Sequence, residues 1–203
     1  LKIDPGHFVA STMERIIIDV VDRCDTSLSK QNSVSAIQHA LPLHGAALIE
    51  NWQAKVARYP DELAHAMVRQ HLSFSPRWIP EMLAERDDFL LLSHNFCAIE
   101  QRLLLILAGL NRVYYPGHKW VHRLIGEMGV TPRDLSRRLK KVLRGPLTTG
   151  VSELCSLIEK TLALVDEQMP EVGIAEAKGR LQQQAHVWER PPSLWPSNSS
   201  SGG

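Results

Sequence analysis

The longest apolar stretch of the chain is the feature that most limits its fold. Between residues 86 and 113, large apolar side chains recur at alternating spacings of three and four residues: Phe89, Leu92, Phe96, Ile99, Leu103, Ile106 and Leu110. That spacing places all seven on one face of an α-helix. Other faces also carry leucines, namely Leu91, Leu104, Leu105 and Leu107. A helix that is apolar around so much of its girth must be buried by several neighbours, so the pattern predicts a central core helix.

The remaining helices are predicted from caps, prolines and apolar spacing. Ser11 and Glu14 form a capping box that would open the first helix. Pro60 stands at an expected first helical turn, and Thr131 with Pro132 would begin another helix. Further helices are expected over residues 33–40, 45–59, 60–72, 131–144, 149–168 and 174–188, with a polar loop at 26–33 and a turn at 75–80. The helix at 149–168 has a single apolar stripe: Val151, Leu154, Ile158, Leu162, Val165 and Met169. One central helix and several one-faced helices indicate a mainly α, up-and-down helical bundle.

Composition narrows the class of protein. The chain has 203 residues, of which 44% are hydrophobic and 22% charged, as in ordinary globular proteins. Its 23 basic and 22 acidic residues nearly cancel, which argues against a nucleic-acid coat or a polybasic membrane anchor. Cys24, Cys97 and Cys155 are far apart and odd in number, so they are expected to be buried, reduced thiols of a cytoplasmic protein.

The sequence predicts neither a signal peptide nor a membrane-spanning helix. The first nine residues lack the cationic and apolar regions of a signal peptide. The apolar stretch of the core helix is long enough to cross a membrane, but polar residues interrupt it: His94, Glu100, Gln101 and Arg102. The sequence therefore predicts no membrane partner.

The segment "LNRVYYPGHKW", residues 110–120, directly follows the core helix, which Pro116 and Gly117 are expected to end. Two interpretations of it stay open. In the first, Tyr114 and Tyr115 close the end of the bundle and Trp120 begins the next helix as a packing residue. In the second, the bundle end faces a cleft in which Arg112, His118 and Lys119 offer positive charge and hydrogen bonds to an anionic or hydroxylated ligand.

This segment, preceded by a leucine-rich helix, resembles a signature in the helical C-terminal region of bacterial nucleotidyltransferase-like proteins. These belong to the DNA polymerase beta-like superfamily, which includes the aminoglycoside and lincosamide nucleotidyltransferases. Residues 39–72 resemble the segment that joins the catalytic sheet to the helical domain in that family. The resemblance covers about residues 1–145. It implies transfer of a nucleoside monophosphate from an NTP to a hydroxylated small molecule or macromolecule, with Tyr114, Tyr115, Lys119 and Trp120 lining the cleft.

The chemistry of this family needs three carboxylates around Mg²⁺, which binds oxygen ligands and bridges triphosphate oxygens to the protein. Two of these carboxylates come from a Gly-Ser motif followed by Asp-x-Asp, and no such motif occurs in this chain. The third lies on a later strand, which "LKIDPGHF" at residues 1–8 resembles. The resemblance therefore implies that Asp4 binds the metal or takes a proton from the acceptor, although Pro5 departs from the family pattern. From the residues alone, it is equally possible that Asp4 is a turn residue before Pro-Gly.

Taken together, the resemblance implies three regions. Residues 1–44 would be the end of an α/β nucleotidyltransferase domain, a short remnant that precedes the bundle; residues 45–188 would be the helical bundle; and residues 189–203 would be a disordered tail. The expected partners are an NTP and a hydroxylated acceptor. Further possible partners are a second copy of the chain and a catalytic domain that this chain lacks.

Other candidate residues have weaker patterns. Asp19, Asp22 and Asp25 share a helix face, which is typical of a solvated surface. His118 and His122 are four residues apart, but they lack the glutamate of the zinc-protease motif. The segment 133–144 is a basic amphipathic helix that could contact phosphates or RNA.

Two other classes of function stay open. The helical domains of these transferases resemble HEPN bundles, some of which are RNases with an arginine and a histidine separated by four to six residues. Arg112 and His118 satisfy that spacing, with His118 as general acid or base and Arg112 holding the phosphate. The other class is a non-catalytic helical module that binds a partner chain.

Overall fold

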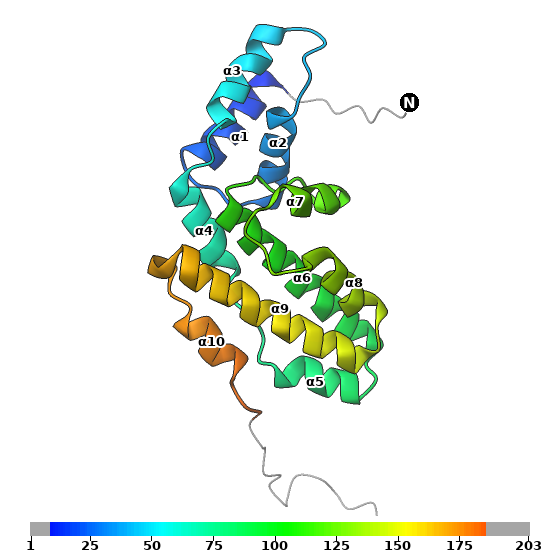
Figure 1. Ribbon diagram of the computed structural model, residues 1–203. Helices are drawn as coiled ribbons and strands as arrows, with labels where there is room; N and C mark the ends of the chain where they lie inside the picture. The colour runs from blue at the N-terminus through cyan, green and yellow to red at the C-terminus, as the bar shows by residue number, and fades with distance from the viewer. Residues whose placement is uncertain (1–8, 186–203) are drawn as a thin grey trace, which may run out of the picture.

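A computed structural model describes residues 9–185, in which the regular elements are all helices and no strand occurs (Figure 1). The α-helices are α1 (Ala10–Val21), α2 (Leu28–Gln38), α3 (Ala46–Val56), α4 (Asp61–His71), α5 (Trp78–Glu85), α6 (Phe89–Asn111), α7 (Val121–Glu127), α8 (Leu135–Arg144), α9 (Leu147–Gln168) and α10 (Ala175–Leu181). Two short 3₁₀ helices complete the order: η1 (His118–Trp120) and η2 (Pro170–Val172). The predicted mainly α fold class is confirmed. Residues 1–8, including Asp4 and the expected strand, and the tail from residue 186 lie outside the described residues.

Helix α6 is the core of the bundle. It packs along α4, α9 and α5, and it also contacts α8 (Figure 1). Every residue from 103 to 110 is buried, because neighbours cover this half of the helix on all sides. The predicted stripe is confirmed from Leu92 onwards, but Phe89 is exposed at 61%, since it is the first residue of the helix. By length and composition alone α6 could cross a membrane, but burial of its second half by other helices is the pattern of a core helix.

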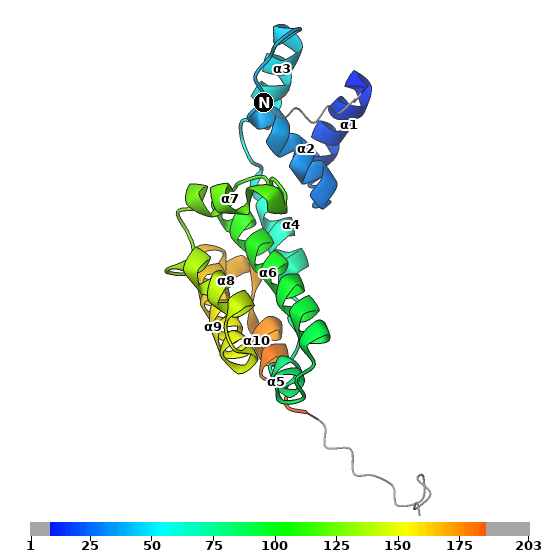
Figure 2. The ribbon, with the colours of Figure 1, turned by 90° about the vertical axis from the view of Figure 1, so that its right-hand side faces the viewer.

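Helices α1, α2 and α3 form a separate three-helix unit at one end of the molecule (Figure 2). They pack against one another and not along the helices of the bundle. The side chain of Gln53 holds α3 to the end of α2 by donating hydrogen bonds to the carbonyls of Ile37 and Ala40, at 3.2 and 2.8 Å. The predicted boundary between residues 44 and 45 would fall inside this unit, between α2 and α3.

The predicted loop at 26–33 is wrong, because α2 already begins at Leu28. Its polar residues contact the end of α1 instead of solvent alone. Lys30 forms ion pairs with Asp19 at 2.8 Å and with Asp25 at 2.6 Å. Lys30 and a Ser27 hydrogen bond lower the pKa of Asp25 to about 2. Asp25 lies beyond the end of α1 and Asp19 is paired, so the predicted solvated helix face of Asp19, Asp22 and Asp25 is not formed.

Several predicted helix ends also differ. Val9, and not Ser11, precedes the first helical residue, because the Val9 carbonyl accepts the N–H groups of Thr12 and Met13. Thr131 and Pro132 lie before a turn, and α8 begins only after Asp134, whose φ is +59°. The predicted turn at 75–80 overlaps the start of α5, whose first turn accommodates Pro80 because the N–H groups of a first turn need no partner within the helix. The last helix ends at Leu181 and not at residue 188.

The three cysteines are free thiols, as predicted, but their environments differ. Cys155 is buried and Cys24 is half-buried, and burial raises the pKa of both thiols. Cys97 is exposed on α6, which contradicts the expectation that all three are buried.

Candidate functional site

The segment 110–120 leaves α6 by a turn that the sequence did not predict. Arg112 adopts the left-handed conformation, with φ +54°, and its N–H bonds to the carbonyls of Ala108 and Gly109. The core helix therefore ends at Asn111, five residues before Pro116. Asn111 fixes this end, because its amide donates to the Val130 carbonyl at 2.8 Å and accepts from the Val130 N–H at 2.7 Å.

Both tyrosines of the segment are buried, as the packing interpretation expects. Tyr114 packs on Tyr59, with ring centroids 4.7 Å apart, and its hydroxyl donates to the Arg58 carbonyl at 3.4 Å. Tyr115 donates a hydrogen bond to, or accepts one from, Nδ1 of His118 at 2.7 Å. Burial raises the pKa of each tyrosine to about 12, so both are phenols at neutral pH.

Arg112 and His118 do not line a common cavity. Arg112 forms an ion pair with Asp61 of α4, with Nε and Oδ1 2.7 Å apart. His118 is exposed on η1 and bonds to Tyr115. An RNase of the HEPN type needs both residues at one phosphate, so this arrangement weighs against that alternative.

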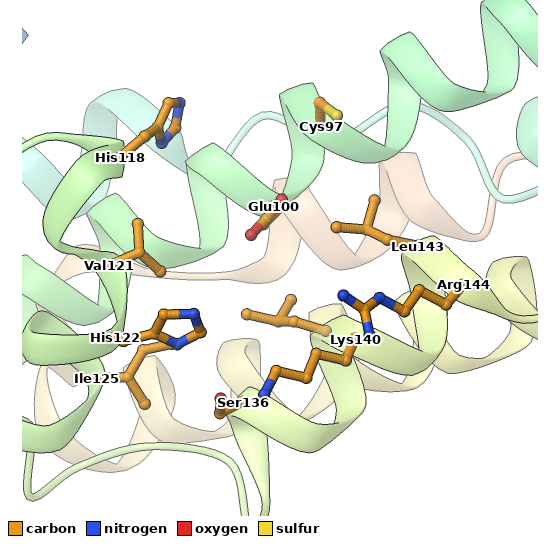
Figure 3. A pocket seen from close by; sticks show the side chains of 11 residues that line it. Cys97, Glu100, His118, Val121, His122, Ile125, Ser136, Lys140, Leu143 and Arg144 are labelled. Carbon is orange, nitrogen blue, oxygen red and sulfur yellow. The ribbon is translucent and has the colours of Figure 1, made fainter.

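His118 lines a pocket of about 500 Å³ between α6, α7 and α8 (Figure 3). We call it the basic pocket. Its lining is Cys97 and Glu100 from α6; His118, Val121, His122 and Ile125 from η1 and α7; and Ser136, Leu139, Lys140, Leu143 and Arg144 from α8. The volume lies within the range of small-molecule sites, roughly 300–1,000 Å³. In Figure 3, Glu100 stands between the two histidines and the two cations of α8.

The side chains of α8 explain why positive charge is concentrated in this pocket. Within residues 9–185, three basic side chains of this segment have acidic partners. Arg137 pairs with Asp134 at 2.6 Å, and Arg138 and Lys141 both pair with Glu153 of α9. Lys140 and Arg144 have no ion-pair or hydrogen-bond partner in this part of the chain, and both line the basic pocket. Two unpaired cations therefore face the cavity.

Among residues 9–185, Glu100 is the only acidic residue of the lining. It is half-buried on α6, and burial raises the pKa of its carboxyl, while nearby His118 acts in the opposite direction. A raised pKa means that the negative charge is disfavoured at this position. Independently of that shift, Lys140 and Arg144 outnumber this one carboxylate, so the charge of the lining suits an anion.

His118 and His122 line the same pocket, as their spacing of four residues allows, but they form no metal site with other described residues. No group of three or more His, Cys, Asp or Glu residues that could hold a metal ion occurs within residues 9–185. Asp4, the predicted Mg²⁺ ligand, lies outside that range.

The other predicted residues lie elsewhere. Tyr114 and Trp120 line a second cavity, between α2 and α7. Lys119 is exposed, and its Nζ lies 5.9 Å from the centroid of the Trp120 ring. The six residues predicted to share one cleft are thus divided: His118 lines the basic pocket, Tyr114 and Trp120 line the second cavity, Tyr115 is in the core, and Arg112 and Lys119 lie on the surface.

Glu100 was not predicted as a site residue, because in the sequence it only interrupts the apolar helix. Its spacing of three residues from Cys97 places the two side chains on one face of α6, and both line the pocket.

A family model described as a domain of unknown function, DUF4037, matches residues 27–121. This range runs from the start of α2 to the first residue of α7, so it includes the segment 110–120 but not Lys140 or Arg144. No curated protein and no solved structure matches the chain.

Proposed function

We propose that this chain supplies the helical substrate-binding domain of a nucleotidyltransferase-like protein, and that the basic pocket holds phosphate groups of its substrate. The activity itself rests on the resemblance of residues 39–72 and 110–120 to that superfamily. The observation that supports phosphate binding is the pair of cations, Lys140 and Arg144, that face the cavity without an acidic partner among the described residues.

The other side chains of the basic pocket fit this role. An arginine fork matches two phosphate oxygens, and a lysine acts as a mobile point charge. Tyr115 stays a phenol at neutral pH and bonds to Nδ1 of His118, which leaves Nε2 of that ring for a ligand. When the phenol donates this bond, Nε2 carries the hydrogen and donates to an anion. Glu100 is a single carboxylate against the two cations Lys140 and Arg144, so the balance of charge in the lining still favours an anion.

Mg²⁺ chemistry is not assigned to the described residues. The resemblance implies Mg²⁺ with Asp4 as one ligand, but residues 9–185 contain no cluster of carboxylates that fits the ion. In this proposal, the metal and the remaining catalytic carboxylates belong to a nucleotidyltransferase domain, and the helices contribute binding.

The test is isothermal titration with tripolyphosphate, ATP and GTP. We expect wild-type protein to bind all three, because the phosphate groups are shared. The double variant K140A/R144A should bind at least about tenfold more weakly, which corresponds to about 1.4 kcal/mol, a modest loss for two charged contacts. Because both side chains are exposed, the melting temperature should stay nearly unchanged.

The matched control is R133A/R137A, which removes the same charge from the same basic segment but outside the pocket lining. The control variant should keep wild-type affinity within about twofold. If binding depended only on the overall positive charge of the segment, both double variants would lose affinity equally. Equal affinities of wild type and K140A/R144A, or no binding of tripolyphosphate, would reject the proposed site. Weakened binding of a short RNA by both double variants, without binding of ATP or GTP, would favour RNA contact along residues 133–144.

A further inference from the structure

The second cavity lies where the three-helix unit meets the bundle, and we call it the junction cavity. It has a volume of about 290 Å³. Asn32, Ser35 and His39 of α2 line one side, and Trp120 of η1 with Arg123 and Glu127 of α7 line the other. Small-molecule sites occur preferentially between structural units, so this location favours a ligand site.

Few contacts join the two units near this cavity. No helix of α1–α3 packs along a helix of the bundle, and α2 and α7 face each other through side chains. Arg123 reaches from α7 to Nδ1 of His39 at 3.2 Å. Tyr114 and Pro116 complete the lining from the loop after α6. A ligand in this space would contact both units at once.

The charges in the junction cavity nearly cancel. Arg123 donates from Nε to Glu127 at 2.7 Å, so the one carboxylate that the described residues give this lining is already paired with their one arginine there. This differs from the basic pocket, where two cations lack acidic partners. The junction cavity therefore suits a neutral ligand.

The lining combines an aromatic ring with unused hydrogen-bonding groups. Trp120 is 50% exposed although it lines a cavity, so part of its indole surface is open. The side chains of Asn32 and Ser35 have no hydrogen-bond partner within residues 9–185, and Ser35 is only 4% exposed. Asn32 can donate and accept, and Ser35 can do either. The site thus offers a stacking surface on one side and donor and acceptor groups on the other.

We propose that the junction cavity binds the base of a nucleoside, stacked on Trp120 and bonded at its edge by Asn32 and Ser35. A base is neutral and planar, and its edge carries both donors and acceptors. Stacking on an aromatic side chain is a general mode of base binding that does not need phosphate. This proposal does not depend on the phosphate site in the basic pocket.

The experiment is isothermal titration of wild-type protein with adenosine, guanosine, cytidine and uridine, with ribose and glucose as non-stacking ligands. We expect at least one nucleoside to bind and the sugars to fail. Trp120→Ala should weaken nucleoside binding by about tenfold, from the loss of one stacking contact. Trp120→Phe should retain part of the affinity, because a smaller ring remains. Asn32→Ala should change the order of preference among the four bases.

Trp78→Phe is the control for loss of a tryptophan, since Trp78 lies on α5 and outside the junction cavity. It should leave nucleoside affinity unchanged. Trp120 is half exposed, so Trp120→Ala should keep the wild-type melting temperature. If it lowers that temperature, Asn32→Ala, at an exposed position, provides the independent comparison.

The outcomes separate this proposal from the phosphate site. Nucleosides carry no phosphate, so K140A/R144A should leave their affinity unchanged, and Trp120→Ala should leave tripolyphosphate binding unchanged. No nucleoside binding, equal affinities of wild type and Trp120→Ala, or binding of the sugars in place of nucleosides would each overturn the proposal. None of these three results would bear on phosphate binding in the basic pocket.

Discussion

Gly109 is the position where the packing of α6 against α4 leaves the least room. A Cβ atom added there would lie 3.0 Å from Val68 Cγ2, 3.1 Å from the Ala64 carbonyl oxygen and 3.2 Å from Met67 Cβ. All three distances are tighter than ordinary van der Waals contact. Gly109→Ala therefore tests whether α4 and α6 approach each other as closely as the structure shows.

Two effects of Gly109→Ala oppose each other. Alanine favours a helix interior over glycine by about 1 kcal/mol. Overpacking of a core costs about 1–3 kcal/mol. The Ala64 oxygen is a backbone atom and Met67 Cβ is fixed to the backbone, so neither can rotate away from the new methyl group. Because α4 itself must move, we expect a cost in the upper part of that range, about 2–3 kcal/mol, and so a net destabilisation of about 1–2 kcal/mol.

The assay is urea unfolding followed by circular dichroism, with Gly126→Ala and Gly179→Ala as controls. Both controls lie in helices, α7 and α10, and a Cβ at either position meets nothing within 4 Å. They should therefore leave stability unchanged or raise it by up to about 1 kcal/mol. If Gly109→Ala is as stable as wild type, or more stable, the proposed close contact between α4 and α6 is refuted.

Two further predictions concern acid stability and activity. Lys30 and Ser27 depress the pKa of Asp25 to about 2, so the ionised carboxylate stabilises the folded state above its unfolded pKa of about 4, and this contribution disappears as pH falls towards 2. Urea midpoints between about pH 5 and pH 2 should fall less steeply for Asp25→Asn than for wild type, and parallel curves would contradict the assignment. The Gly-Ser and Asp-x-Asp motif is absent from the 203 residues, so the chain alone should transfer no nucleotide. Incubation with Mg²⁺ and labelled ATP or GTP should leave aminoglycosides, lincosamides and tRNA unlabelled. Robust labelling would show that the chain needs no further catalytic residues.

The core was predictable because its signal is local. Large apolar residues at helical spacing identify α6 and the stripe of α9 without any knowledge of their neighbours. Helix α2 was missed in its first half because it carries few apolar residues there. In this half Lys30 pairs with Asp19 from the preceding helix, and a contact of that kind is absent from any local pattern.

Helix ends were less predictable, since two of them depend on left-handed residues that are not glycine. Arg112 and Asp134 have φ values of +54° and +59°. Glycine usually occupies such positions, so arginine gives no sequence signal for them. Pro116 and Gly117 looked like the end of the core helix, but they lie in the loop that follows it.

The division of the segment 110–120 between two cavities follows from the geometry of η1. A 3₁₀ helix has three residues per turn, so His118 and Trp120, two positions apart, point about 120° apart around its axis. The same division continues along α7. The basic pocket is lined by His118, Val121, His122 and Ile125. The junction cavity is lined by Trp120, Arg123 and Glu127. Both sets have the intervals of three and four residues that mark single helix faces. Given only that a helix begins at His118, the sequence would have predicted two opposite faces with different chemistry, one bearing two histidines and the other a tryptophan and an ion pair. The error lay in treating the aromatic and basic residues as one cluster because they are neighbours in sequence.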